Sequence, residues 1–278
     1  MRTKAGSARA CFVAFDLLNL NGEDFRQRPI EERRAALSPL VAGVHCILFS
    51  DALAAEGAVV VAAGRTLSKV QATVAEIEAD GGRGLAVRCD VGVEADIEAC
   101  VAATVGAFGT VDILVNNAQE VPLGTLDSVS REQFEAGWRT GPLASFSFMV
   151  ACRPHLRDGG VVINLGTGAS LRPDPIGYGA YGAVKEATRA LTRAAACEWG
   201  PEGIRVVTIV PLADSAGLQG WAAARPEEAA AFFATVPLGR AGDCRDDIGR
   251  VVVFLCGPDG RYITGTTVTV DGGQAHLR

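Results

Sequence analysis

The sequence predicts an α/β fold in which a parallel β-sheet is covered by helices on both faces. From Ala58 onward, short apolar runs alternate with longer segments of helical periodicity. The apolar runs are continuous and do not alternate with polar residues, which is typical of strands buried on both faces. At 278 residues, the chain fits one large domain, or one domain with a small appendage.

The expected elements follow in order along the chain. Before Ala58, the sequence predicts a strand over 11–18, a turn over 19–24, a charged helix over 29–37 and a second strand over 44–49. Beyond it, strands are predicted at 59–63, 84–89, 111–116, 161–165, 205–210 and 267–270. Helices are predicted at 68–79, 94–108, 131–155 and 181–199. The Ala-rich segment 213–238 has no strand signal and is expected to form a lid or loop on the substrate side.

Composition narrows the class of protein. Hydrophobic residues make up 49% of the chain, which suffices for a sizeable core. The net charge of −6 offers no electrostatic footprint for nucleic acid or for an anionic membrane. No apolar run reaches the roughly 20 residues of a membrane span, and the N-terminus lacks the apolar core of a signal peptide.

The number and spacing of cysteines and histidines give no sign of a metal site. Eight cysteines are scattered without C-x-x-C spacing, and three histidines lie far apart in sequence. We therefore expect no metal site, and we expect free thiols in a reducing cytoplasm.

Tyr181 and Lys185 are the first candidates for chemistry. They lie four residues apart in a predicted helix, so they share one of its faces. A phenol with a pKa near 10 is a poor acid at neutral pH, and a neighbouring ammonium would lower that pKa toward the range in which proton transfer is efficient. The pair thus predicts a proton donor for a carbonyl that receives a hydride.

Several motifs accompany this pair at characteristic intervals. They are DILVNNA at 112–118, VVINLGT at 161–167, YITG at 262–265 and VDGG at 270–273. Together with Tyr181-x-x-x-Lys185 they resemble the short-chain dehydrogenase/reductase family, from about residue 54 to residue 278. The resemblance implies a Rossmann-type doubly wound parallel sheet and hydride transfer between NADP(H) and a small carbonyl or alcohol substrate. It also implies a homodimer or homotetramer that packs through the helices at 131–155 and 181–199.

The resemblance assigns catalytic roles to three residues. Tyr181 would act as general acid in reduction and as base in oxidation. Lys185 would lower the pKa of Tyr181 and bind the nicotinamide ribose. Thr167 occupies the place of the family's serine and keeps the hydroxyl that orients the substrate oxygen, with Ser170 as an alternative.

The resemblance also assigns the cofactor side. Arg65 follows the second strand, where a cation suits the 2′-phosphate of NADP, although NAD remains an alternative. Asp90 and Val91 match the position that meets the adenine edge. Asn117 is expected near the cofactor, and Asn116 is expected to brace the sheet.

The sequence departs from the family at its N-terminal end. No Thr-Gly-x-x-x-Gly-x-Gly turn stands before Ala58, so the first strand and the Gly-rich loop are expected to be replaced or missing. Residues 45–50 are one candidate substitute strand, with 51–56 as the stub of its helix. Residues 1–53 resemble an internal fragment of ATP-dependent DNA ligases without the lysine of the K-x-D-G motif, and this fragment would supply a substitute edge or first strand.

Two further departures lie in the predicted site. The helix asparagine that many family members use for a proton-relay water is replaced by Gly141, and Gln119 stands where the Asn-Asn-Ala-Gly run has its glycine. Two readings of function stay open. One is an active NAD(P)-dependent oxidoreductase, and the alternative is a catalytically impaired fusion remnant or binding protein that lacks the pyrophosphate loop.

Overall fold

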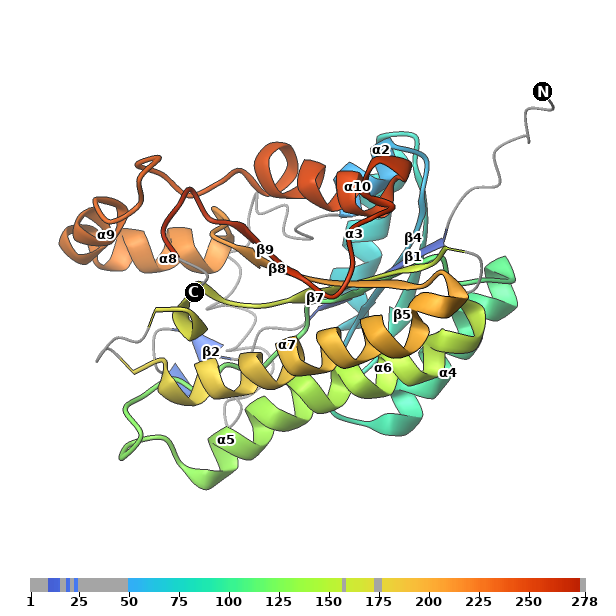
Figure 1. Ribbon diagram of the computed structural model, residues 1–278. Helices are drawn as coiled ribbons and strands as arrows, with labels where there is room; N and C mark the ends of the chain where they lie inside the picture. The colour runs from blue at the N-terminus through green and yellow to red at the C-terminus, as the bar shows by residue number, and fades with distance from the viewer. Residues whose placement is uncertain are drawn as a thin grey trace.

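The computed structural model describes residues 10–15, 19–20, 23–24, 50–156, 159–172 and 177–275. Within them, a seven-stranded sheet runs through the centre of the molecule, and helices cover it on both sides (Figure 1). The strand order is β5-β4-β1-β6-β7-β8-β9, and every neighbouring pair is parallel. The expected α/β architecture with a parallel sheet is confirmed.

The strands match the apolar runs closely. They are β1 (Ala10–Phe15), β4 (Val59–Gly64), β5 (Arg83–Arg88), β6 (Ile113–Asn116), β7 (Val161–Leu165), β8 (Arg205–Pro211) and β9 (Thr267–Val270). A separate antiparallel pair, β2 (Asn19–Leu20) and β3 (Glu23–Asp24), lies where the sequence predicted a turn.

The helices fall into three groups. One group covers one face of the sheet: α2 (Ser50–Ala55), α3 (Leu67–Ala79) and α10 (Arg250–Cys256). The second group covers the other face: α4 (Glu94–Phe108), α5 (Arg131–Trp138), α6 (Ala144–Cys152) and α7 (Gly179–Trp199). Two short helices, α8 (Ala216–Ala224) and α9 (Pro226–Phe233), form the segment that the sequence predicted as a lid.

The two faces of the sheet carry two separate cores. Along β4, Val60 and Ala62 pack with α3 and α10, whereas Val61 and Ala63 pack with α4, α6 and α7. This alternation follows from the two-residue period of a strand. All six residues of β4 are buried, which explains why its sequence is apolar throughout.

The helical run that the sequence predicts over 131–155 is interrupted by a π-helical turn, η2 (Arg139–Leu143), between α5 and α6. Pro142 lies inside this turn. Because proline has no N–H, it cannot close a helical hydrogen bond, and a wider turn is the usual way a helix absorbs such a defect. The run then ends in a short 3₁₀ turn, Arg153–His155.

The first-strand position of the sheet is occupied. Strand β1 pairs with β4 through all six of its residues and with β6 through Cys11, Phe12 and Val13. The sequence left two outcomes open, a replaced or a missing first strand, and the structure excludes a missing one. The idea that residues 45–50 supply this strand is wrong, because β1 fills the place and Ser50 begins helix α2. Most of the chain between Phe15 and Ser50, including the predicted helix over 29–37, lies outside the described residues.

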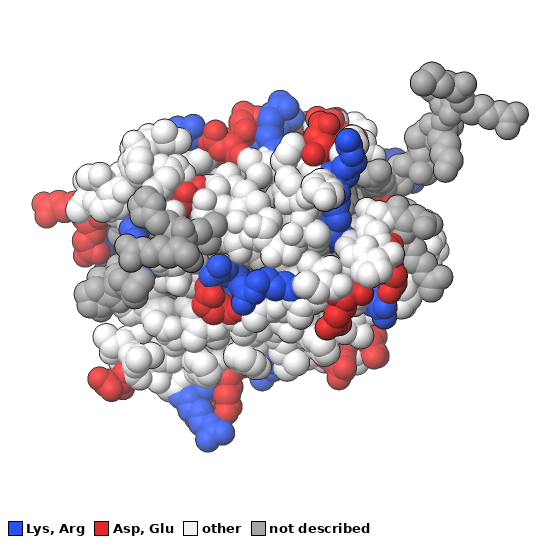
Figure 2. All heavy atoms as spheres, in the orientation of Figure 1, with Lys and Arg blue, Asp and Glu red and all other residues white. Residues whose placement is uncertain are grey.

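Three observations on membrane spans, surface charge and cysteines complete the description. Of the helices in the described part of the chain, none is long and apolar enough to cross a membrane. On the face shown in Figure 2, basic and acidic side chains are interspersed, and a group of both signs lies near the middle of the face. The six cysteines among the described residues are all free thiols.

Candidate active site

The first turns of α7 hold the predicted tyrosine and lysine. Tyr181 is half-buried and Lys185 is 4% exposed. The Lys185 ammonium nitrogen lies 5.7 Å from the centroid of the Tyr181 ring. The helix thus places the two groups on one face, as the four-residue spacing predicts.

Thr167 reaches this pair from the end of β7. It stands in extended conformation before the 3₁₀ turn Gly168–Ser170, and its hydroxyl oxygen accepts from the Ala169 N–H at 3.3 Å. Its side chain lies close enough to the Tyr181 phenol to act on it, because it lowers the pKa of that phenol against the larger effect of burial. The Ser170 hydroxyl donates to the Thr167 carbonyl oxygen at 3.0 Å, so Ser170 is engaged in the turn. Of the two hydroxyls, that of Thr167 acts on the Tyr181 pKa, whereas that of Ser170 donates within the turn.

A backbone carbonyl at the end of β7 holds the Lys185 side chain in place. Its ammonium donates to the Leu165 carbonyl oxygen at 2.7 Å, and within the described residues this is its one hydrogen bond. Burial lowers the pKa of Lys185 from 10.5 to about 7. A buried ammonium carries three N–H donors, so two of them are available to acceptors from outside the protein.

The pKa of Tyr181 differs from the expectation. Burial raises it to about 12, the Thr167 hydrogen bond lowers it by a lesser amount, and Tyr178 adds a small upward contribution. The expected lowering by Lys185 is therefore wrong for this structure. The physical reason is that burial disfavours the charged form of both groups, so the lysine loses the charge that would stabilise a phenolate.

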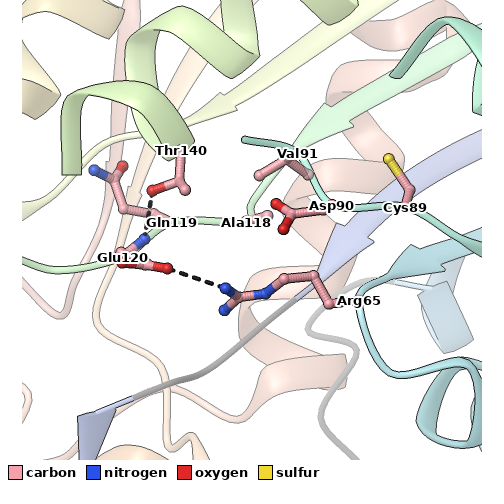
Figure 3. A pocket seen from close by; sticks show the side chains of 8 residues that line it. All are labelled: Arg65, Cys89, Asp90, Val91, Ala118, Gln119, Glu120 and Thr140. Atoms are coloured by element: carbon pink, nitrogen blue, oxygen red, sulfur yellow. Dashed lines mark hydrogen bonds and ion pairs between the residues drawn. The ribbon is translucent and has the colours of Figure 1, made fainter. Parts of the chain in front are cut away.

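A second cluster forms a pocket at the ends of β4, β5 and β6 (Figure 3). Three predicted cofactor residues come together there, namely Arg65, Asp90 and Val91. The remaining lining residues are Cys89, Ala118, Gln119, Glu120 and Thr140. Both clusters lie at the carboxyl ends of parallel strands, where open α/β sheets bind their ligands.

Asp90 is positioned by its own turn. Its N–H donates to the Asp96 carboxylate at 2.9 Å, and its carboxylate accepts from the Gly92 N–H at 2.9 Å. Val91 is buried and packs in the core under α4. The turn after β5 thus presents a fixed carboxylate to the pocket.

Asn116 and Asn117, at the end of β6, lie in different surroundings. The Asn116 amide donates to the Asn164 side chain at 2.8 Å, which links β6 to β7 inside the core. Asn164 in turn donates to the Thr192 hydroxyl at 2.9 Å. The bracing role expected for Asn116 is confirmed. Asn117 is half-buried beside the pocket but does not line it.

Five pocket residues had no role assigned from the sequence, and three of them, Gln119, Glu120 and Thr140, make polar contacts there. Glu120 forms an ion pair with Arg65, its N–H donates to the Thr140 hydroxyl, and Gln119 donates to the Gly137 carbonyl oxygen. The available signal was the run Asn116-Asn117-Ala118-Gln119-Glu120, in which a bulky polar residue and an acid follow the familiar Asn-Asn-Ala.

The donor set fits a dinucleotide cofactor at both ends. Arg65 and Asp90 offer a cation and a carboxylate in the first pocket. At the other end, the two unused donors of Lys185 match the hydroxyls of a ribose beside the Tyr181 phenol.

Comparisons with known proteins agree with this geometry. The family model for enoyl-(acyl carrier protein) reductases matches residues 48–275. The chain is 38% identical, over 80% of its length and 88% of the relative's, to 12α-hydroxysteroid dehydrogenase from a Clostridium species. It also resembles a short-chain dehydrogenase from Burkholderia cenocepacia solved with NADP, at 32% identity and a TM-score of 0.74, over 80% of this chain and 89% of the other.

A further solved structure extends the likeness toward the N-terminus. It is 3-ketoacyl-(acyl-carrier-protein) reductase from Brucella melitensis with NADH, which is 25% identical over 96% of this chain and 98% of its own, with a TM-score of 0.75. The similar structures thus hold either NADP or NADH. The matched family model, the sheet order and the paired tyrosine and lysine lead to one conclusion: the chain belongs to the short-chain dehydrogenase/reductase family of NAD(P)-dependent oxidoreductases.

Proposed function

We propose that the protein exchanges hydride between NADP(H) and a carbonyl or alcohol substrate, with Thr167, Tyr181 and Lys185 as its catalytic residues. The convergence of these three side chains at the ends of β7 and α7 carries the proposal. The nicotinamide supplies or accepts the hydride when the cofactor is bound.

Tyr181 handles the proton. With a pKa raised to about 12, its phenol stays protonated at neutral pH and can donate to a substrate oxygen that gains charge. The Thr167 hydroxyl accepts from Ala169, and its single O–H donor would turn from the Tyr181 phenol to the same substrate oxygen and orient it. In the free protein, the phenol is therefore in the acid form that the reductive direction requires.

Lys185 tunes the tyrosine. Its pKa of about 7 leaves it partly neutral in the free protein. Ribose hydroxyls that accept its two unused N–H groups would favour the ammonium form. The restored charge would then lower the pKa of Tyr181 and allow it to serve as base in the oxidative direction.

Arg65 supports NADP as the preferred cofactor, because a guanidinium pairs well with a phosphate. Asp90, Val91 and Asn117 would contact the adenosine half. NAD remains the alternative, because Arg65 is already engaged by Glu120 at 3.0 Å.

The lid supports a substrate with an apolar body. In it, Trp221 and Phe232 meet edge to face at 5.6 Å, and the Arg172 guanidinium lies 5.9 Å from the Phe232 ring centroid. Arg172 follows the turn that carries Thr167, so the lid aromatics lie against the loop at the catalytic end of β7. A secondary alcohol on an apolar skeleton, as in the hydroxysteroid named for the Clostridium relative, is a fitting first substrate to test.

A stripe of exposed apolar side chains supports a homodimer or homotetramer. Its members are Phe134, Trp138, Leu143, Phe146 and Val150, and each is between 37% and 50% exposed. The π-helical turn spans five residues and ends at Leu143, and its wider turn brings the Leu143 side chain to the same face as Trp138. Such a stripe along α5 and α6 fits a partner subunit, since monomers rarely expose a continuous apolar patch.

The N-terminal division stays a proposal. Residues 1–53 would supply strand β1 to a family domain that covers residues 54–278. The resemblance of this segment to a DNA-ligase fragment and a cytoplasmic setting also stay predictions. An impaired protein is the competing function, because the sequence between Phe15 and Ser50 has only Gly22 and Gly43 and therefore no Gly-rich pyrophosphate turn.

One experiment separates the two functions. Purified protein is mixed with NADPH and a panel of ketones, including a steroid ketone, and NADPH absorbance is followed. Turnover that disappears in Tyr181→Phe supports the enzyme. Binding of NADPH by calorimetry without turnover of any substrate, in wild type as in Tyr181→Phe, would favour the impaired protein.

A further inference from the structure

The pocket in Figure 3 contains an ion pair that no catalytic step requires. The Arg65 guanidinium and the Glu120 carboxylate lie 3.0 Å apart, and their side chains are only 21% and 17% exposed. We propose that Glu120 sets the cofactor preference of this pocket by competing with the 2′-phosphate of NADP(H) for Arg65. This inference rests on the proposed function and deepens it.

Charge in the pocket supports the competition. Among the side chains that line it, Arg65 contributes one positive charge, whereas Asp90 and Glu120 each contribute a negative one. A phosphate monoester adds a charge of about −1.5 to −2 at pH 7. The 2′-hydroxyl of NAD(H) adds none. The Glu120 charge therefore weakens the binding of NADP(H) by repelling its 2′-phosphate, and this repulsion is absent for NAD(H).

Glu120 is held where it stands. Its N–H donates to the Thr140 hydroxyl at 2.8 Å, and this hydroxyl donates to the Ala136 carbonyl oxygen at 2.8 Å. The preceding Gln119 donates its amide to the Gly137 carbonyl oxygen at 3.0 Å. Two consecutive residues are thus attached to the end of α5, so the backbone under Glu120 cannot withdraw freely when a phosphate arrives.

A glycine makes this attachment possible. A Cβ atom at Gly141 would lie 2.5 Å from the Gln119 amide nitrogen and 2.7 Å from its oxygen. The Gln119 side chain thus fills the space that a side chain at position 141 would need. The two departures that the sequence shows, Gln119 and Gly141, are therefore one structural feature that positions Glu120 across from Arg65.

The expected effect can be stated as a ratio. A neighbouring opposite charge shifts the ionisation equilibrium of a group by about one to three powers of ten, and a like charge acts in the opposite sense. The lower end applies because the pair is partly exposed. Removing the Glu120 charge should therefore tighten binding of a 2′-phosphate by about tenfold and leave an unphosphorylated ribose unchanged.

The test uses ligands that differ only in this phosphate. Full-length wild type, Glu120→Gln and Arg65→Gln are titrated with adenosine 2′-monophosphate and with adenosine, and amide chemical shifts report binding. This readout depends on neither turnover nor the pyrophosphate turn. Glu98→Gln, on the exposed face of α4, is the matched control because it removes the same charge outside the pocket.

The outcomes distinguish a wrong role for Glu120 from a wrong cofactor site. We expect Glu120→Gln to raise the affinity ratio of the phosphate over adenosine about tenfold, Arg65→Gln to lower it, and Glu98→Gln to leave it at the wild-type value. An unchanged ratio in Glu120→Gln, with both ligands bound near Asp90, overturns this inference and leaves the proposed function standing. Failure of both ligands to bind any variant overturns both.

Discussion

Replacement of Lys185 by methionine should change how the stability of the free protein depends on pH. Burial lowers the pKa of Lys185 from 10.5 to about 7 in the folded state. Between these two values the unfolded chain binds more protons than the folded one, so the free energy of unfolding rises with pH across this window. Methionine has a similar length and no charge, and it removes this contribution.

The size of the effect follows from the two pKa values. Below pH 7 the buried ammonium disfavours folding fully, and above it this penalty declines by up to about 1.4 kcal/mol per pH unit. With a folded pKa of about 7, the calculated gain between pH 7 and pH 9 is about 2 kcal/mol. Wild type should therefore gain about this much over Lys185→Met across these two pH units.

Urea unfolding of both proteins at pH 7, 8 and 9 measures this difference. Tyr181→Phe is the control at the same site, because a phenol with a pKa of about 12 does not titrate in this range and the variant should keep the wild-type slope. Parallel pH profiles for wild type and Lys185→Met would refute the reasoning. That result would mean that the ammonium keeps its charge inside the free protein.

Four further outcomes are expected. Tyr181→Phe should reduce turnover by roughly 10²–10⁴-fold, because the proton donor is lost. Turnover rates of wild type and variant, compared at equal NADPH occupancy, would check this. Thr167→Ser should keep most activity and Thr167→Ala should lose it, and equal rates for the two would exclude a role for the hydroxyl. NADPH should bind more weakly than about 1 mM, where binding contributes only about 4 kcal/mol, and replacement of residues 1–53 by a family-type strand and glycine loop should tighten it. Micromolar affinity by calorimetry in the unmodified chain would contradict that expectation. Light scattering should find a dimer or tetramer that Trp138→Glu weakens, and a wild-type monomer at micromolar concentration would count against it.

Local sequence pattern sufficed for most of the fold. Continuous apolar runs predict the strands after Ala58 within one or two residues at each end, since a strand buried on both faces tolerates no polar alternation. Helical spacing predicts α7 and the full extent of the run from Arg131 to His155. It does not predict the π-helical turn within that run, because the turn depends on how Pro142 is accommodated.

The sequence did not determine which N-terminal segment forms the strand between β4 and β6. Two apolar segments before Ala58 were strand candidates, and only the pairing of Ala10–Phe15 with β4 and β6 identifies the one that enters the sheet. Strand pairing joins residues far apart in the chain, so a single strand's own sequence does not report its neighbours.

Some features of the candidate site also follow from the sequence alone, and others depend on the tertiary structure. The sequence alone determined that Tyr181 and Lys185 share a helix face and that Arg65 and Asp90 each follow a strand, since spacing within one element sets both. Only the tertiary structure decided that Glu120 faces Arg65, that Gln119 fills the space beside Gly141, and that the Tyr181 pKa rises instead of falling. The physical reason is that ion pairs across strands, steric exclusion and burial depend on which distant segments surround a group, and these are properties of the folded chain.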